Sequence, residues 1–167
     1  MENENPKKVA LYPGSFDPFT MGHLDIVERA VKVFDSVEIT VAVNAEKKGL
    51  FSLEERCGLI RECVQHLTQV TVVAHEGLIV DRAKTINAIA LVRGLRQVAD
   101  FDYEFRLAFA NRRLCPELET VFLMTSQEHA FVSASIVRDI HKWGGDLSSF
   151  VPPPVARALS LLGTEKS

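Results

Sequence analysis

The chain has 167 residues, of which 47% are hydrophobic and 25% charged, and its 19 Lys and Arg against 22 Asp and Glu leave a formal net charge of −3. These values predict one soluble globular domain and argue against an extended nucleic-acid surface, which requires a basic domain. No apolar run approaches the ~18 residues of a membrane span, and the polar N-terminus lacks the apolar core of a signal peptide. We therefore expect a cytoplasmic protein that has neither a nucleic acid nor a membrane as partner.

Short apolar runs rich in β-branched residues recur along the chain with helix-length segments between them. Their near-continuous hydrophobicity is typical of strands covered on both faces. In the second run the sequence VEITV at 37–41 alternates, which predicts a strand nearer an edge of the sheet. The predicted strands are 9–12, 37–43, 70–74, 88–92 and 121–124.

The intervening segments have helical patterns. Ser52 and Glu55 form the spacing of a capping box that opens one helix, and Gly144-Gly145 is a helix C-cap signal. Alternating strands and helices predict a parallel sheet with right-handed crossovers. The predicted helices are the stripe Leu24, Val27, Val31 and Phe34, then the helix opened by Ser52, and 79–86, 100–114, 135–143 and 155–162.

The segment 100–114 is apolar on two sides. One stripe holds Phe101, Phe105 and Phe109, and a second holds Tyr103, Leu107, Ala110 and Leu114. A helix that is apolar on more than one face is either deeply buried or shared with another subunit, so the pattern favours a homo-oligomer.

These elements predict one domain over 1–167, with a flexible segment at 1–7 and a helical tail at 152–167. The expected architecture is a five-stranded parallel sheet with helices on both faces. If the strand order is 3-2-1-4-5, a ligand crevice lies between the carboxyl ends of the first and fourth strands.

The loop after the first strand, PGSFDPFTMGH at 13–23, leads into a helix. Thr20 is expected as its N-cap, which places Gly22 and His23 in the first turn, where free N–H groups and the helix dipole favour an anion. An ordinary turn with a surface His is the alternative for a lone Gly-His pair. The complete string favours the anion site.

The loop after the fourth strand contains Arg93 and Arg96, which could meet successive phosphates of a polyphosphate. A solvated basic turn is the alternative, and a position opposite His23 favours the phosphates. The loop at 44–51 adds Lys47 and Lys48, a weaker signal by itself.

Several common motifs are missing from the sequence. It has no G-x-x-x-x-G-K-[ST], G-x-G-x-x-G or H-E-x-x-H, and no G-x-S-x-G surrounds Ser15, so the sequence supports no Walker NTPase, zinc site or acyl hydrolase. The remaining residues of interest are predicted to be structural: His66, His75 and His141 at the surface or at helix ends, and Cys57, Cys63 and Cys115 as reduced thiols.

The string at 14–23 resembles the T-x-G-H form of the nucleotidyltransferase signature. The co-linear segments KKGLFSLEER (47–56), VRGLRQVADFDYE (92–104), NRRLCPELETVFL (111–123) and FVSAS (131–135) narrow the resemblance to the bacterial phosphopantetheine adenylyltransferase family, over about 9–154. Three positions depart from its pattern: Met21 where Asn is usual, His129 where Tyr or Trp is common, and Ala134 within a Ser-Ser-Ser run.

The resemblance implies a Rossmann-like fold and transfer of the adenylyl group of ATP to 4′-phosphopantetheine. The products are dephospho-coenzyme A and pyrophosphate, in the penultimate step of coenzyme A biosynthesis. It also implies direct attack without a covalent intermediate, Mg²⁺ arriving with ATP rather than on a protein metal site, a homohexamer, and possible feedback by coenzyme A.

The family's functional positions transfer to this sequence by motif. The resemblance implies catalytic roles for His23, Lys47 and Arg96, and contacts to the phosphopantetheine substrate from Ser15, Lys47, Ile79 and Arg93. The implied ATP-binding residues are Ser15, Phe16, His23, Gly94, Leu95, Arg96, Glu104, His129, Ala130, Phe131, Val132, Ser133, Ala134 and Ser135.

Three other functions remain open at this level. The nearest is a related nucleotidyltransferase acting on nicotinate mononucleotide or glycerol phosphate. The others are a non-catalytic nucleotide sensor and a structural scaffold with solvated basic loops.

Overall fold

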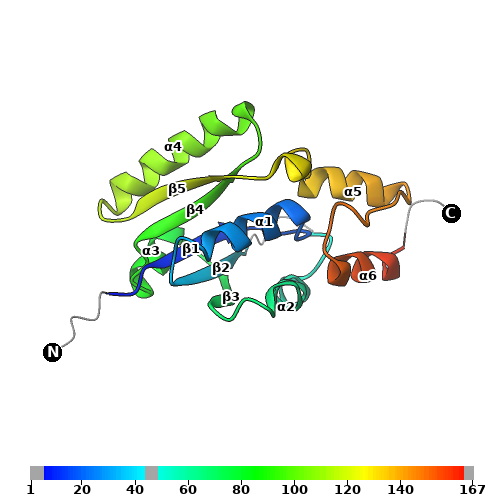
Figure 1. The fold of residues 1–167 in the computed structure, drawn as a ribbon, viewed down its shortest axis with the longest axis horizontal. Helices are drawn as coiled ribbons and strands as arrows, with labels where there is room; N and C mark the ends of the chain where they lie inside the picture. The colour runs from blue at the N-terminus through cyan, green and yellow to red at the C-terminus, as the bar shows by residue number, and fades with distance from the viewer. Residues whose placement is uncertain (1–5, 44–48, 164–167) are drawn as a thin grey trace.

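The computed structural model describes residues 6–43 and 49–163, and its centre is a parallel sheet (Figure 1). The strands follow the order β3-β2-β1-β4-β5, the order on which the expected ligand crevice depended, and every neighbouring pair is parallel, as predicted. Their bounds are β1 (Val9–Gly14), β2 (Ser36–Ala42), β3 (Val70–His75), β4 (Ala90–Leu95) and β5 (Glu119–Met124).

Helices cover both faces of the sheet. Their bounds are α1 (Met21–Ala30), α2 (Leu53–Val64), α3 (Ile79–Thr85), α4 (Val98–Leu114), α5 (Ala134–Lys142) and α6 (Pro153–Leu161), with a 3₁₀ turn, η1 (Gln127–His129), before α5. In the larger core, α1, α2, α5 and α6 pack on the sheet face that carries the side chains of Ala10 and Tyr12. The smaller core packs α3 on the opposite face, against Leu11 and Leu91.

The position of β2 corrects one prediction. The alternating sequence at 37–41 predicted a strand near an edge, but β2 lies between β1 and β3. Its polar residues Glu38 and Thr40 are buried, and the Glu38 carboxylate accepts hydrogen bonds from Thr40 (2.9 Å) and from the Arg82 guanidinium of α3 (2.9 and 2.6 Å). A buried ion pair therefore produces the pattern that resembles solvent exposure.

The ends of β4 also differ from the prediction. The predicted strand 88–92 begins two residues too early and ends three too early. Arg93, Gly94 and Leu95 stay in the ladder because they pair with Phe122, Leu123 and Met124 of β5. The two arginines of this segment are therefore held at the end of a strand, one inside it and one just after it.

The predicted helix caps are confirmed. Thr20 caps α1 and Ser52 caps α2, each with the reciprocal contact of a capping box. After α5, Gly144 has a φ of 67°, the left-handed conformation that a glycine C-cap favours. The predicted C-terminal helical tail is α6, which packs into the larger core through Val155 and Leu159.

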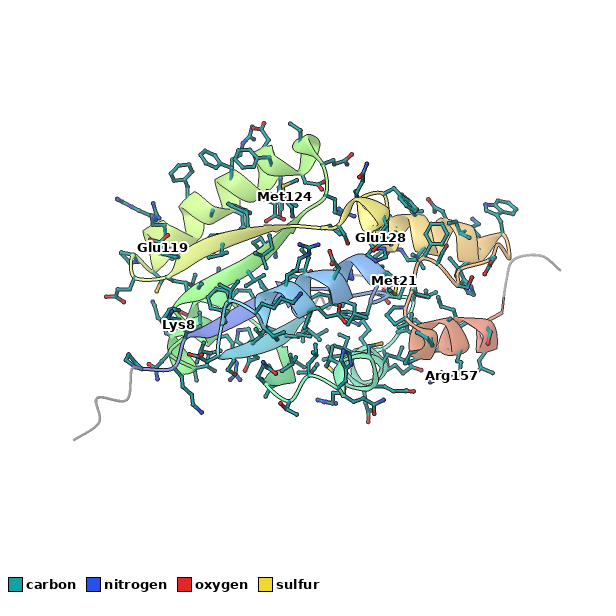
Figure 2. All side chains as sticks on the ribbon, viewed as in Figure 1. Lys8, Met21, Glu119, Met124, Glu128 and Arg157 are labelled. Atoms are coloured by element: carbon teal, nitrogen blue, oxygen red, sulfur yellow. The ribbon has the colours of Figure 1, made fainter. Side chains whose placement is uncertain are left out.

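Helix α4 is not deeply buried within this chain. Phe101, Phe105 and Phe109 contact one another along the helix, with ring centroids 5.2 and 4.6 Å apart, and are 43 to 56% exposed. Figure 2 shows side chains projecting from the outer side of this helix. Of the two expectations for an apolar helix, deep burial is wrong, and a shared subunit surface stays a prediction.

Other expectations meet the structure in simpler ways. Cys57, Cys63 and Cys115 are buried free thiols. Within 6–43 and 49–163, no helix is long and apolar enough to cross a membrane. Of the N-terminal segment 1–7, only Pro6 and Lys7 are described, and both are exposed without regular structure.

Candidate active site

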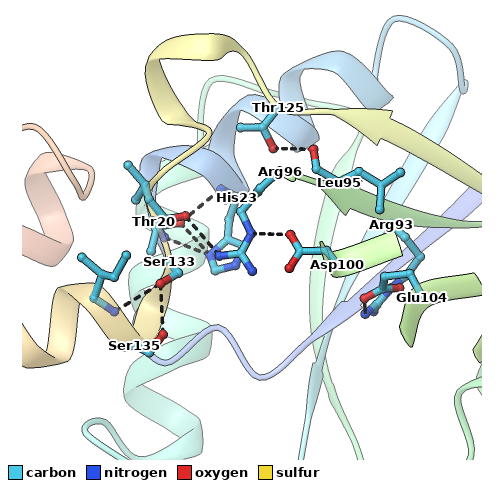
Figure 3. Close-up of polar contacts among 12 residues, drawn as sticks. Thr20, His23, Arg93, Leu95, Arg96, Asp100, Glu104, Thr125, Ser133 and Ser135 are labelled. Carbon is cyan, nitrogen blue, oxygen red and sulfur yellow. Dashed lines mark hydrogen bonds and ion pairs between the residues drawn. The ribbon is translucent and has the colours of Figure 1, made fainter. Parts of the chain in front are cut away.

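A cleft of about 370 Å³ opens at the carboxyl ends of β1 and β4. The strand order reverses between these two strands. This is where open α/β sheets bind ligands. The loop after β1, the first turn of α1, the end of β4 and the start of α5 all reach it (Figure 3). The residues that line it are Tyr12, Pro13, Gly14, Ser15, Phe16, Thr20, Gly22, His23, Ile26, Arg93, Gly94, Arg96, Glu104, Thr125, Val132, Ser133, Ala134, Ser135 and Arg138.

His23 is fixed by the helix cap that precedes it. The Thr20 backbone N–H donates to His23 Nδ1 over 3.0 Å, and the Thr20 hydroxyl lies 3.1 Å from the same nitrogen while it accepts from the His23 backbone N–H. Because Nδ1 must accept from a backbone N–H, the ring proton of neutral His23 sits on Nε2. The cap thus selects the tautomer that can donate from Nε2.

The surroundings of His23 keep it uncharged. Burial, reinforced by the charges of Arg96 and Arg93, lowers the pKa of His23 to about 3. Its ring also packs against Phe16 and Phe19, with centroids 5.1 and 5.5 Å away. At neutral pH the imidazole is a neutral hydrogen-bond donor beside two permanent cations.

Arg93 and Glu104 form a two-point ion pair between β4 and α4. Arg93 Nε and Nη2 each lie 2.6 Å from a Glu104 carboxylate oxygen, and Nη1 donates to the Pro13 carbonyl over 3.0 Å. Burial opposes the charge on Arg93, but Glu104 outweighs it and raises the Arg93 pKa. A guanidinium has five N–H groups, so two remain for a ligand.

Arg96 and the start of α5 form the opposite wall. Arg96 Nη1 donates to the Val132 carbonyl over 3.3 Å, and Arg96 Nε lies 3.4 Å from the Asp100 carboxylate. Ser133 caps α5, and its hydroxyl lies 3.0 Å from that of Ser135. A helix N-terminus with two hydroxyls beside an arginine suits phosphate oxygens.

Arg138 is a site residue that the sequence reasoning missed. It projects from α5 into the cleft, and its Nη1 donates to the Asp17 carbonyl over 2.5 Å. Its spacing from Ser135, three residues along a helix, was the signal that could have identified it, because such residues share a helix face. Tyr12 and Thr125 were also missed. Tyr12 lies within the apolar run of β1 and Thr125 directly follows β5, and neither position has a sequence pattern that indicates a site.

The structure brings most predicted residues together, but not all. Eleven of the predicted positions line the cleft: Ser15, Phe16, His23, Arg93, Gly94, Arg96, Glu104, Val132, Ser133, Ala134 and Ser135. Leu95 ends β4 and accepts a backbone hydrogen bond from Thr125, while Phe131 packs against Phe150. His129 is the last residue of η1, and Ala130 is its C-cap.

Two predicted residues of the acceptor side lie elsewhere or cannot be placed. Ile79 is the first residue of α3 and packs against the smaller core, outside the cleft lining. Lys47 lies outside the described residues. Among those residues, no group of three or more His, Cys, Asp or Glu could hold a metal ion.

The cleft combines hydrogen-bond donors that suit phosphate with a neutral His, at the edge of a doubly wound sheet. Comparison with known proteins shows which class of protein has this fold and site. A family model described as cytidylyltransferase-like matches residues 11–140, from β1 into α5. The fold and site therefore define a nucleotidyltransferase. The chain belongs, more narrowly, to the phosphopantetheine adenylyltransferase family, as its curated relatives establish.

Proteins of that name share about half of their residues with this chain. The phosphopantetheine adenylyltransferase of Moorella thermoacetica is 52% identical over 91% of this chain and 95% of its own length. That of Alkaliphilus oremlandii is 50% identical over 92% of this chain and 98% of its own length.

Solved structures share the fold at much lower identity. A Vibrio parahaemolyticus protein provisionally described as a nicotinate-nucleotide adenylyltransferase superposes with a TM-score of 0.70 at 18% identity, covering 93% of this chain and 92% of its own. A lipopolysaccharide core biosynthesis protein from Thermoplasma volcanium has a TM-score of 0.55 at 20% identity, covering 72% and 99%. At such identities only the Rossmann-like fold is shared.

Proposed function

We propose that this protein transfers the adenylyl group of ATP to 4′-phosphopantetheine, giving dephospho-coenzyme A and pyrophosphate in the penultimate step of coenzyme A biosynthesis. The observation that carries the proposal is the neutral Nε2–H donor of His23, held between Arg93 and Arg96 where β1 and β4 end. The activity named for relatives at about 50% identity supports the choice of substrates.

The reaction needs one bond formed and one broken at the α-phosphorus. An oxygen of the acceptor's phosphate attacks in line, and the bond to the β-phosphate oxygen breaks so that its electron pair leaves with pyrophosphate. A phosphate monoester with a second pKa near ~6 is already largely ionised at neutral pH, so no protein base is needed. Because Nδ1 of His23 is occupied by Thr20 and Nε2 is protonated, the imidazole serves as a donor, without a covalent intermediate.

The transferred group gains negative charge as the reaction proceeds, and the cleft meets it with preorganised donors. His23 Nε2–H would donate to the α-phosphate in the transition state, which is electrostatic stabilisation by a fixed dipole. Being neutral, His23 adds this hydrogen bond without attracting ATP by its own charge. Its contribution should therefore fall on turnover more than on nucleotide affinity.

The α5 side of the cleft is the proposed triphosphate site. Arg96 and the Ser133 and Ser135 hydroxyls would contact the β- and γ-phosphates, and Arg138 of α5 offers a second cation. Gly94, Leu95 and Glu104, with the segment 129–135, are the other proposed ATP contacts. We propose that Mg²⁺ arrives with the triphosphate and uses few protein ligands.

The opposite side is the proposed acceptor site. The two N–H groups of Arg93 that Glu104 and Pro13 leave free would hold the acceptor's phosphate together with Lys47. Ser15 would lie where the two substrates meet, and Ile79 would contact the pantetheine arm beyond the cleft.

The same proposal extends to assembly and regulation. The exposed aromatic face of α4 would be buried between copies in a homohexamer, because a surface this apolar is costly to leave in water.

Coenzyme A carries both halves of the product, so we expect it to compete as a feedback inhibitor. Three buried free thiols suit a cytoplasmic location.

The direct test is identification of the product. The protein is incubated with ATP, Mg²⁺ and 4′-phosphopantetheine, and the mixture is analysed by mass spectrometry for dephospho-coenzyme A. The expected result is one dephospho-coenzyme A per pyrophosphate released. Binding of ATP without product would favour a nucleotide sensor, and absence of nucleotide-dependent thermal stabilisation would favour a scaffold.

A further inference from the structure

The loop between β1 and α1 is held in a conformation that its sequence does not favour by itself. Phe16 has a φ of 48°, a left-handed conformation that is uncommon outside glycine and costs free energy. Its ring is 3% exposed and lies under Gly14, where a built Cβ would stand 2.8 Å from Phe16 Cζ. The same ring makes an edge contact with His23. The conformation of this loop therefore determines what packs against the imidazole.

Contacts from three other segments hold the loop on both sides of Phe16. Arg56 Nη1 of α2 donates to the Ser15 carbonyl over 2.7 Å, and Arg138 donates to the Asp17 carbonyl. The Asp17 carboxylate accepts from the backbone N–H groups of Leu50 and Phe51, over 2.7 and 3.0 Å. Asp17 is only 8% exposed, so this carboxylate is a buried acceptor shared by two amides.

We propose that Asp17 is a positioning residue for His23: by binding the Leu50 and Phe51 amides, its carboxylate holds the β1–α1 loop so that Phe16 stays against the imidazole. Asp17 is outside the cleft lining, so it acts through Phe16 rather than on a substrate. The link to catalysis rests on the function proposed above, but the link from Asp17 to the His23 ring does not.

Gly49 provides a second way to disturb the same contact. A Cβ built on Gly49 would stand 2.7 Å from Asp17 Oδ2 and 3.0 Å from the Phe51 carbonyl. Gly49→Ala therefore displaces the carboxylate while leaving Asp17 chemically intact. Asp17→Asn is the complementary change, because an amide presents N–H groups where one of the two backbone donors needs an acceptor.

Asp35 supplies the matched control. Its carboxylate accepts a backbone N–H from Lys8 over 2.8 Å, a bond of the same kind and length, at the amino-terminal edge of the sheet. Asp35→Asn makes the same chemical change, a carboxylate to an amide, far from the cleft. The charged and titratable groups that line the cleft with His23 are Tyr12 of β1, Arg93 of β4, Arg96 just after β4, Glu104 of α4 and Arg138 of α5. Asp100 of α4 pairs with Arg96, and none of the three substitutions replaces any of these groups.

The test follows the His23 ring by ¹H–¹⁵N NMR from pH 5 to 8 and assigns its signals with His23→Gln. In the wild type and in Asp35→Asn we expect a ring protonated only at Nε2 that does not titrate over this range. In Asp17→Asn and Gly49→Ala, loosened packing admits water, so we expect the ring to titrate and to lose its single tautomer. In these two variants we expect kcat for pyrophosphate release to be at least ~10-fold lower than in the wild type, while ATP affinity changes less than ~3-fold.

Two outcomes would overturn the proposal. One is a folded Asp17→Asn protein whose His23 titration and kcat match the wild type. The other, which decides the matter if Asp17→Asn does not fold, is a Gly49→Ala protein with wild-type ring signals. If the wild type shows the expected ring signals but no adenylyl transfer, the proposed function fails while the positioning role stays testable by NMR.

Discussion

At the residue scale, His23 shows how a fold selects one chemical role for a side chain with several. A histidine can act as base, nucleophile, acid or neutral donor. Here Thr20 occupies Nδ1, and burial with two neighbouring arginines suppresses the cationic form. Only donation from Nε2 remains. Thr20 and His23 are therefore one functional unit, which the helix cap builds.

Replacing His23 tests that role. We expect His23→Ala to lower kcat by at least ~10²-fold while ATP affinity stays within a few-fold, because the donor acts on charge that develops in the transition state. Steady-state pyrophosphate release and calorimetric ATP titration measure the two effects. His23→Gln keeps a residue that can complete the capping box, so it should lose turnover with less loss of stability than Ala. Near-normal turnover in His23→Ala would rule out the assigned role.

The low pKa of His23 also makes a prediction about stability. Its pKa is about 3 in the folded protein and 6.5 ordinarily, so between these values the unfolded chain binds the extra proton. Stability should therefore fall as pH decreases below about 6.5, with a slope of at most ~1.4 kcal/mol per pH unit from this group. Denaturant unfolding from pH 7 to 5 should show a smaller loss in His23→Gln than in the wild type. Parallel curves would contradict the burial of a neutral imidazole.

At the scale of elements, the site is assembled from strand ends and helix starts that the sequence predicts unevenly. Helix caps are local, so the sequence predicted Thr20 as an N-cap and Ser52 with Glu55 as a capping box. The Glu38–Arg82 and Arg93–Glu104 pairs join separate elements, and no local pattern indicates them. The first gives an internal strand the alternating pattern that predicted a strand nearer an edge. The second shows that Arg93 holds β4 and α4 together, in addition to its proposed contact with a substrate.

The division of the cleft into two substrate sides can be tested through Arg93 and Lys47. We expect Arg93→Ala and Lys47→Ala to raise KM for phosphopantetheine more than KM for ATP, because both cations are proposed to bind the acceptor's phosphate. Glu104→Gln breaks the same ion pair and keeps the arginine, and because Glu104 is a proposed ATP contact it should raise KM for ATP more than KM for phosphopantetheine. Equal changes in both KM values for Lys47→Ala would refute this division.

The aromatic face of α4 makes a prediction about assembly. Phe105 and Phe109 are exposed in the single chain, and we expect Phe105→Asp with Phe109→Asp to dissociate the oligomer by placing charges in an apolar interface. Light scattering coupled to size-exclusion chromatography measures the mass. Leu161→Asp on α6, where Leu161 is 87% exposed, is the matched control and should leave the assembly unchanged. A monomeric wild type would contradict the assignment of this face.

At the scale of the whole molecule, the strand order places two distant loops in one cleft. The order β3-β2-β1-β4-β5 brings the ends of β1 and β4 together, so residues about 70 positions apart in sequence, such as His23 and Arg93, line the same site. The net charge of −3 does not describe this cleft, where three arginines converge. The net charge of the chain argued against a nucleic-acid surface, but it did not exclude a polyphosphate site.

What the sequence could not predict is equally specific. Arg138 enters the cleft from α5 on the same helix face as Ser135, but which face of α5 meets the cleft depends on how the helix packs. The strain at Phe16 and the contacts of Asp17 depend on tertiary structure that joins the β1–α1 loop to residues 49–51 and to α5. Motifs identified the reacting groups, but the contacts that hold them in place came only from the structure.

The measurement that tests the central claim most directly is the initial rate of pyrophosphate release with different acceptors and nucleotides. The wild-type protein is supplied with ATP or CTP and, in turn, with 4′-phosphopantetheine, nicotinate mononucleotide or glycerol 3-phosphate. The predicted result is turnover with ATP and phosphopantetheine at least ~10²-fold faster than any other combination, as expected when a site hydrogen-bonds one substrate's polar groups. A comparable or higher rate with another acceptor, or none with phosphopantetheine, would contradict the account.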